Sequence, residues 1–158
     1  NPTPVAVSAN TYTKFADNDT SDSENSKFGD ANSEGTFDVE DLAMGMIRFD
    51  NGAVLQIEFS WASNIKTENR FVELRGTKAG LKWKDNEVEF FTEEDGQLLD
   101  IKPAGNLESK GHHNNLVHFL DVLTKGADPC FKPQQGVDMI KILCAIYESA
   151  EKGKEIVL

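Results

Sequence analysis

Two polar stretches hold the side chains best suited to chemistry, and residues 108–115 form the denser one. They read Glu-Ser-Lys-Gly-His-His-Asn-Asn and lie just before a predicted helix. From such a loop His112 and His113 could contact a substrate, because neutral imidazole both donates and accepts hydrogen bonds. Adjacent histidines also suit a metal ion, although no third ligand follows at a helpful spacing. The structural alternative is that His113 or Asn114 caps the helix and that the histidines are surface residues.

The second stretch follows a predicted strand and contains Trp61, Ser63 and Asn64. A Trp at a strand end can be the apolar platform on which a sugar or polyol lies, with Ser63 and Asn64 offering hydrogen bonds beside it. The competing interpretation is that Trp61 packs in the core or at the sheet edge, as most aromatic side chains do.

Established catalytic motifs are absent from the sequence. It contains no Gly-x-Gly-x-x-Gly, no phosphate-binding glycine loop, no His-Glu-x-x-His and no cysteine pair at metal-binding spacing. Residues 17–22, Asp-Asn-Asp-Thr-Ser-Asp, resemble a calcium loop but lack its glycine and its distal glutamate. Single arginines at positions 48, 70 and 75 have carboxylates to pair with, and nothing marks them as anion clamps. We therefore predict no catalytic residue and no metal site.

Length and composition predict one globular domain over residues 1–158. The formal net charge of −11 argues against nucleic acid and anionic membranes as partners, since both require clustered Lys and Arg. No apolar run reaches the length of a membrane span. Two cysteines, Cys130 and Cys144, make no disulfide framework and favour a cytoplasmic location, with Cys144 as a small buried hydrophobe. From the abrupt start at Asn1, without Met, we expect a fragment of a longer protein, with N-terminal processing as the alternative.

The element expected to position Trp61 is a hairpin over residues 37–63. Its Asn51-Gly52 pair predicts a type I′ turn, because both residues tolerate positive φ. The outgoing strand alternates apolar and polar residues, which indicates one solvated face. The incoming strand is apolar on both faces, which predicts a sheet whose second face is covered by helices or by another subunit. The two faces are Leu42, Met44 and Met46 on one side, and Val39, Ala43, Ile47 and Phe49 on the other.

The remaining pattern adds strands and then helices to this hairpin. Alternation and turn signals predict strands at 5–15, 70–75, 81–84, 87–92, 97–101 and 155–158. Helical spacing predicts helices at 115–125 and 135–152, each followed by a glycine. The predicted apolar stripe of the second helix comprises Val137, Ile140, Leu143, Cys144 and Tyr147, widened by Ile142 and Ile146. Residues 16–35 are polar and predict a mobile loop. The predicted fold is α+β: an open, mainly antiparallel sheet covered on one face by two C-terminal helices.

Several short segments occur in a distinctive order along nearly the whole chain. They are Glu-Asp-Leu-Ala at 40–43, Ile-Arg-Phe-Asp-Asn-Gly-Ala at 47–53, Ser-Trp at 60–61, Glu-Leu-Arg-Gly-Thr-Lys-Ala-Gly at 73–80, Asn115 with Phe119, and Ala-Ile-Tyr-Glu-Ser-Ala-Glu-Lys-Gly-Lys-Glu-Ile-Val-Leu at 145–158. Together they resemble the C-terminal domain of the Gfo/Idh/MocA oxidoreductases, the family of glucose–fructose oxidoreductase and inositol dehydrogenase.

This resemblance implies a sheet with helices on one face and a second subunit on the other. It implies a preceding Rossmann domain that binds NAD or NADP, with hydride moving between the nicotinamide and a sugar-like substrate. The family's catalytic Lys, Asp and His would lie upstream of Asn1, so none is carried over. What carries over is the rim of the substrate pocket, which would comprise Trp61, Ser63, Asn64, His112 and His113.

We therefore expect the C-terminal substrate-binding and oligomerisation domain of a cytoplasmic NAD(P)-dependent oxidoreductase that acts on a sugar or polyol. It would form a homo-oligomer through its sheet face and would have no dehydrogenase activity by itself. One alternative is a stand-alone, non-catalytic binding or dimerisation module that uses the same face for a protein partner. Another is a parent protein that keeps the fold and has lost catalysis.

Overall fold

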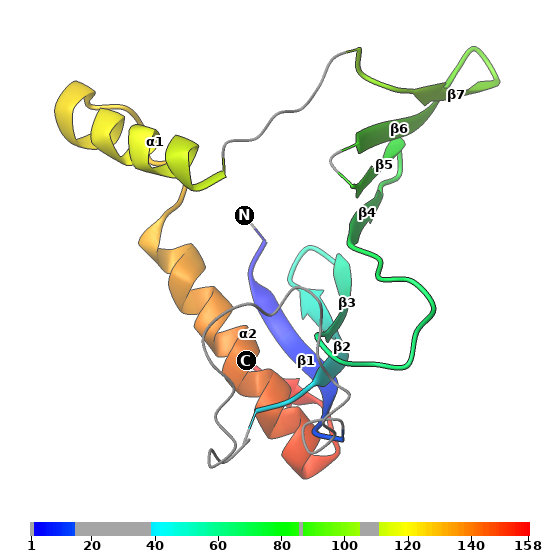
Figure 1. Cartoon of the computed structure of the whole chain (residues 1–158), viewed down its shortest axis with the longest axis vertical. Coiled ribbons are helices and arrows are strands. Elements are labelled where there is room, and N and C mark those ends of the chain that lie inside the picture. The colour runs from blue at the N-terminus through cyan, green and yellow to red at the C-terminus, as the bar shows by residue number, and fades with distance from the viewer. Residues whose placement is uncertain (1, 15–38, 86, 105–110) are drawn as a thin grey trace. The chain divides into compact units, whose positions relative to one another are not determined.

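The computed structural model describes residues 2–14, 39–85, 87–104 and 111–158, where it places eight strands and two helices (Figure 1). The predicted loop at 16–35 lies outside these residues. Two compact units are formed, the first by Asn1–Asn64 with Cys130–Leu158 and the second by Ile65–Pro129. The elements are β1 (Pro4–Tyr12), β2 (Leu42–Phe49), β3 (Val54–Ser60), β4 (Phe71–Arg75), β5 (Ala79–Lys84), β6 (Glu87–Glu94), β7 (Gln97–Ile101), α1 (Gly111–Lys125), α2 (Pro133–Lys152) and β8 (Ile156–Val157).

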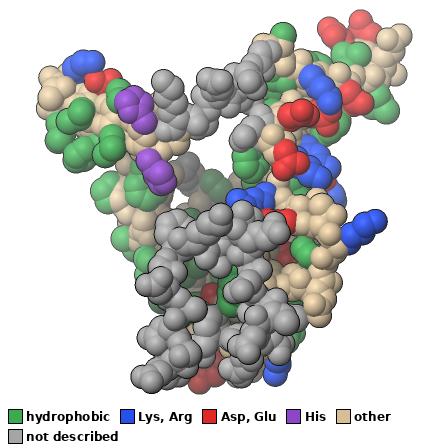
Figure 2. All heavy atoms as spheres, in the orientation of Figure 1, with side chains coloured by type: hydrophobic (Ala, Val, Ile, Leu, Met, Phe, Trp, Pro, Cys, Tyr) green, Lys and Arg blue, Asp and Glu red, His purple; other side chains and the backbone are tan. Residues whose placement is uncertain are grey.

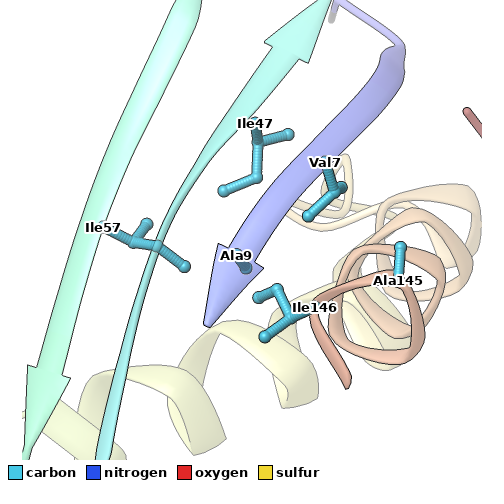
Figure 3. Close-up of a cluster of buried hydrophobic side chains, with 6 residues drawn as sticks. All are labelled: Val7, Ala9, Ile47, Ile57, Ala145 and Ile146. Carbon is cyan, nitrogen blue, oxygen red and sulfur yellow. The ribbon is translucent and has the colours of Figure 1, made fainter. Parts of the chain in front are cut away.

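The first unit is a four-stranded antiparallel sheet in the order β3-β2-β1-β8, with α2 packed on one face. Its core lies between β1, β2, β3 and α2, where the apolar side chains of strands and helix converge (Figure 3). Because alternate residues of a strand point to opposite faces, β2 turns Ile47 toward α2 and Met46 away from it. Ile47 is accordingly 1% exposed and Met46 53%. The core residues are Val7, Ala9, Ile47, Ile57, Ala145 and Ile146.

The hairpin between β2 and β3 is confirmed, but its turn differs from the predicted type I′. The N–H of Gly52 donates to the carbonyl of Phe49 at 3.0 Å, and the N–H of Phe49 donates to the carbonyl of Ala53 at 3.0 Å. Gly52 has φ +84°, whereas Asn51 is not among the residues with positive φ. This is a three-residue loop, a type I turn followed by a left-handed glycine, and Asn51 supports it by accepting from the N–H of Ala53 at 3.0 Å.

Helix α2 begins at Pro133, two residues earlier than predicted, and ends before Gly153 as expected. Gln135 Oε1 accepts from the N–H of Lys132 at 2.7 Å, and Gly153 adopts φ +61°, so both ends are capped. The predicted apolar stripe meets the sheet only at the residues that widen it, Ile142 and Ile146. Its central residue Ile140 is 60% exposed, and Cys144 is exposed rather than buried as predicted. Apolar residues surround most of this helix, so periodicity alone could not select the side that meets the sheet. The buried residues are Ala145, Ile146 and Ser149.

The second unit is an antiparallel meander in the order β4-β5-β6-β7, together with α1. Between β6 and β7 the two-residue turn Asp95-Gly96 has positive φ at both positions, 51° and 78°. Helix α1 begins at Gly111, four residues before the predicted start. None of its residues is buried, and Figure 2 shows hydrophobic side chains gathered on it.

The predicted α+β class with open antiparallel sheets is confirmed, and the eight strands are divided between two sheets of four instead of forming one. Strand β4 pairs with β5, its neighbour across a short turn, and not with β3. Sequence signals indicate where strands and turns occur, but not which consecutive strands pair with each other. The division of the strands between two sheets could therefore not be predicted from the pattern.

The single arginines form ion pairs, as the many carboxylates in the sequence allow. These pairs are exposed, so each contributes little to stability. They join Arg48 to Glu155 at 2.7 Å, Arg70 to Glu68 at 2.6 Å and Arg75 to Glu73 at 2.6 Å.

Candidate functional site

A polar region of the first unit that forms several hydrogen bonds is centred on Val39, Glu40 and Asp41, which we call the 39–41 segment. It leads into β2 and lies against the end of β1. The N–H of Asp41 donates to the carbonyl of Tyr12 at 2.9 Å, and the carboxylate of Asp41 accepts from the N–H of Lys14 at 2.5 Å. Asp41 is 1% exposed, and these two bonds tie the segment to the end of β1.

Trp61 lies directly after β3 and is held by the same segment. Its indole Nε1–H donates to the carbonyl of Glu40 at 2.8 Å, and its backbone N–H donates to the carbonyl of Asp41 at 3.2 Å. The side chain nevertheless keeps 42% of its surface exposed. The ring is therefore fixed by its polar edge while much of its apolar surface stays accessible.

The carboxylate of Glu40 connects the segment to α2. The hydroxyl of Tyr147 donates to Glu40 Oε2 at 2.7 Å. This hydrogen bond raises the pKa of Tyr147, with smaller contributions from desolvation and from the negative charge of Glu40. Glu40 thus contacts two aromatic residues, Trp61 through its backbone and Tyr147 through its side chain.

An exposed aromatic surface beside a carboxylate and a phenol is suited to binding a polyhydroxylated ring. The C–H face of a sugar packs on an indole, and carboxylates accept hydrogen bonds from sugar hydroxyls. Ser63 and Asn64 follow Trp61 on the same connection and are both exposed. Their predicted contact with a substrate stays a prediction.

His112 and His113 lie in the first turn of α1 and not in a loop before the helix, which corrects the predicted boundary. Both are exposed and belong to the second unit. The helix begins with Gly-His-His-Asn-Asn, which has no apolar periodicity, so the pattern did not reveal the earlier start. Their proposed roles toward a substrate stay predictions.

Sequence reasoning did not single out Glu40 and Tyr147 as partners of Trp61. Glu40 appeared as part of a family segment, and Tyr147 as one residue of an apolar stripe. The two lie 107 positions apart, and no spacing rule links a residue before one strand to a residue on a distant helix. The one signal in the sequence was the phenol of Tyr147 within an apolar stripe. The hydroxyl of a buried or half-buried phenol usually has a hydrogen-bond partner elsewhere in the fold.

Two hollows lie elsewhere in the first unit. One borders the start of α2 and has an almost wholly apolar lining that includes Phe131, Pro133, Val137, Met139 and Ile140. The other has a mixed lining that includes Ser8, Asn10, Met44, Met46, Gln56 and Glu58. All six of these residues lie on the face of the sheet opposite to Ile47, by strand alternation.

The helices and the metal-ligating side chains in the described parts of the chain bear on membrane and cofactor binding. Neither helix there is long and apolar enough to cross a bilayer. Across the same residues, no three His, Cys, Asp or Glu side chains are grouped so that they could hold a metal ion. The two described sheets are antiparallel and therefore differ from the parallel βαβ unit, with its glycine-rich turn, of the Rossmann dinucleotide-binding fold.

A family model described as "Oxidoreductase family, C-terminal alpha/beta domain" matches residues 2–158. D-glucoside 3-dehydrogenase of Escherichia coli (strain K12) is 27% identical over 124 residues, which are 78% of this chain and 35% of that protein. The chain therefore spans about a third of the length of this curated relative.

Solved structures share the fold at low identity. Levoglucosan dehydrogenase in complex with NADH and levoglucosan matches with a TM-score of 0.72 and 19% identity, over 98% of this chain and 45% of that one. Aldose-aldose oxidoreductase from Caulobacter crescentus, complexed with glycerol, matches with a TM-score of 0.68 and 20% identity, over 99% and 42%.

Proposed function

This chain belongs to the Gfo/Idh/MocA oxidoreductase family as its C-terminal alpha/beta domain, and from that premise we propose that it is the substrate-side and oligomerising domain of an NAD(P)-dependent sugar oxidoreductase. The matched relatives include dehydrogenases of a glucoside and of levoglucosan. The proposed substrate is therefore a glucose-like ring, as a glycoside or an anhydro sugar. Its hydroxyl or carbonyl would exchange hydride with a nicotinamide.

The observation that carries the substrate class is the state of Trp61. Its indole edge is anchored on Glu40 while 42% of the side chain remains exposed. A fixed, accessible aromatic ring binds a sugar without first losing side-chain freedom, which is the usual benefit of a preorganised site. Ser63, Asn64, His112 and His113 are proposed as further rim residues on the basis of the family resemblance alone.

The nicotinamide cofactor is assigned to the longer protein and not to this chain. One structural neighbour holds NADH, which supports NAD or NADP as the cofactor of the parent. When bound, the cofactor would supply the hydride acceptor or donor. The contribution of this chain is to bind and orient the sugar and to shield it from water.

The oligomerising role is assigned to the face of the first sheet that α2 leaves uncovered. Met46 and Val54 on this face are 53% and 57% exposed, and Leu42 and Met44 lie beside them. The Ile47 face is already occupied by α2, so of the two apolar faces predicted for this strand, only the Met46 face remains for a second subunit.

The sugar-binding role is tested by saturation-transfer NMR on this chain, with levoglucosan as the probe. Transfer of magnetisation from protein to sugar is expected for the unsubstituted chain. It is also expected for the control Trp83→Phe, which alters the chain's other Trp. Trp61→Ala should weaken binding about 2- to 10-fold, the range for an aromatic contact. Trp61→Phe should retain much of the binding because it keeps an aromatic face. Equal sugar binding by Trp61→Ala and by the unsubstituted chain would contradict this assignment. No sugar binding by the unsubstituted chain would favour the stand-alone module.

A further inference from the structure

The geometry points to Glu40 and Tyr147 as positioning residues for Trp61, an assignment that rests on the proposed sugar-binding function. Glu40 lies between the two aromatic residues and contacts both. Through it, the hydroxyl of Tyr147 on α2 sets the orientation of an indole ring at the end of β3. Neither residue needs to contact the sugar for this role.

Trp61 is attached to the 39–41 segment through both its side chain and its backbone. An indole has a single hydrogen-bond donor, and here that donor is used on the carbonyl of Glu40 at 2.8 Å. The backbone N–H of Trp61 bonds to the next carbonyl, that of Asp41, at 3.2 Å. Contacts from one residue to two consecutive carbonyls tie the indole to the 39–41 segment, so the ring follows any movement of that segment.

The 39–41 segment is itself held on two sides. Toward β1 it is held by backbone and carboxylate bonds of Asp41 to Tyr12 and Lys14. Toward α2 the attachment is the 2.7 Å bond from Tyr147 to the carboxylate of Glu40. A hydrogen bond to an ionised acceptor is stronger than a neutral one. Removing it would free the α2 side of the segment while leaving the β1 side in place.

Tyr147 lies outside the hydrophobic core, so a role in positioning Trp61 can be distinguished from a general contribution to stability. The core cluster contains Ala145 and Ile146 of α2 but not Tyr147, which is 52% exposed. Tyr147→Phe removes one hydroxyl and retains the ring, so the helix keeps its packing on the sheet. Its expected effect is local, on the angle and mobility of Trp61.

The test uses this chain with Trp83→Phe, which leaves Trp61 as its only Trp. Indole ¹H–¹⁵N spectra and acrylamide quenching of fluorescence report the environment of that ring. Tyr147→Phe and Glu40→Ala should both shift the indole resonance and raise the quenching constant about twofold. Glu40→Gln keeps an acceptor oxygen and should restore most of the parent spectrum. Tyr12→Phe is the matched control, since it changes the chain's other Tyr and should leave the indole unchanged.

The outcomes separate this inference from the proposed function. Levoglucosan binding is measured by saturation transfer on the same samples. In one outcome the unsubstituted chain binds the sugar, and Tyr147→Phe and Glu40→Ala change neither the indole spectrum nor the affinity. That result would overturn the positioning role and leave the sugar-binding function intact. In the other outcome the unsubstituted chain binds no sugar, but both substitutions still shift the indole resonance. That result would overturn the sugar-binding function and support the link from Tyr147 through Glu40 to Trp61. If Glu40→Ala fails to fold, the unchanged or changed spectrum of Tyr147→Phe alone decides.

Discussion

The side-chain oxygen of Ser149 accepts the backbone N–H of Ala9 at 2.9 Å, although 140 positions separate the two residues. Strand β8 pairs with β1 at Ala6 and Val7, so Ala9 lies beyond its reach on that edge. The hydroxyl also donates to the carbonyl of Lys154 at 2.7 Å. Ser149, which is 2% exposed, thereby continues the ladder where the short strand stops and joins the sheet to the end of α2.

Ser149→Ala should destabilise the protein by about 1–3 kcal/mol, because a buried N–H loses its acceptor. Denaturant unfolding gives the free energy of unfolding directly. Thr124→Ala is the matched control: its hydroxyl also bonds to a backbone carbonyl, that of Leu120, but at an exposed position. The control should change stability by less than about 0.5 kcal/mol. Equal effects of the two substitutions would contradict the role given to Ser149.

Gly45→Ala should also destabilise the protein, by about 1–3 kcal/mol as for other overpacked sites. A Cβ added at Gly45 would lie 2.6 Å from the backbone oxygen of Ser8 and 2.7 Å from Cβ of Ala9, so β1 would have to move. Gly136→Ala is the control. Its added Cβ meets only the Phe131 ring, at 3.4 Å and beyond, and alanine favours a helix. Thermal unfolding should show a lower midpoint for Gly45→Ala and an unchanged or higher one for Gly136→Ala.

Alkaline pH should weaken the link between Tyr147 and Glu40. The pKa of Tyr147 is raised above its ordinary value of 10.0 in the folded protein, chiefly by the hydrogen bond to Glu40. The folded state therefore binds its phenolic proton more tightly than the unfolded state does. The stabilisation is complete below about pH 10 and is lost as pH rises through the folded pKa.

Free energies of unfolding measured from about pH 8 to about pH 11.5, a range that brackets ordinary tyrosine titration, check this. The difference between the parent and Tyr147→Phe should shrink as the pH passes 10. Subtracting the variant cancels the many other groups that titrate in the same range. If the difference in free energy of unfolding stays constant with pH, titration of the Tyr147 hydroxyl does not affect stability, and this prediction is wrong.

Met46→Glu should disrupt the proposed subunit contact. A charge introduced on the uncovered sheet face would be buried without a partner in an interface, which is costly. Light scattering across a dilution series should show a dimer or larger assembly for the parent and a smaller species for the variant. Leu98→Glu, at a position that is 89% exposed in the second unit, should leave the mass unchanged. A parent that is monomeric at every concentration would contradict the oligomerising role.

Local signals in the sequence determined most of the elements. The alternating segments around residues 51 and 52 predicted the hairpin of β2 and β3, because side-chain period and turn residues act over a few positions. The turn type was less determined. Asp95-Gly96 adopts the geometry with two positive φ values, whereas at Asn51-Gly52 only the glycine does. Asn tolerates a positive φ without requiring it, so the turn type was set by the number of loop residues in each hairpin.

Patterning was weakest where it offered more than one solution. Helix α2 is apolar on most sides, and packing against β1 selected Ala145 and Ile146 over Ile140 and Cys144 as buried positions. Helix α1 includes His112 and His113 because helical bonding extends into residues with no apolar period. Hydrophobic periodicity records that a face can be buried, but the choice among faces depends on the partner surface.

The candidate site shows the same division. The residue type and position of Trp61 at a strand end identified it from the sequence alone as a candidate platform for a sugar, with packing in the core or at the sheet edge as the alternative. Its supports, Glu40 and Tyr147, emerged only in the folded chain, because the bond between them spans 107 positions. Side-chain spacing is informative within a helix or strand, over a few residues. Contacts across such a distance are set by how the sheet and α2 pack, which only the tertiary structure decided.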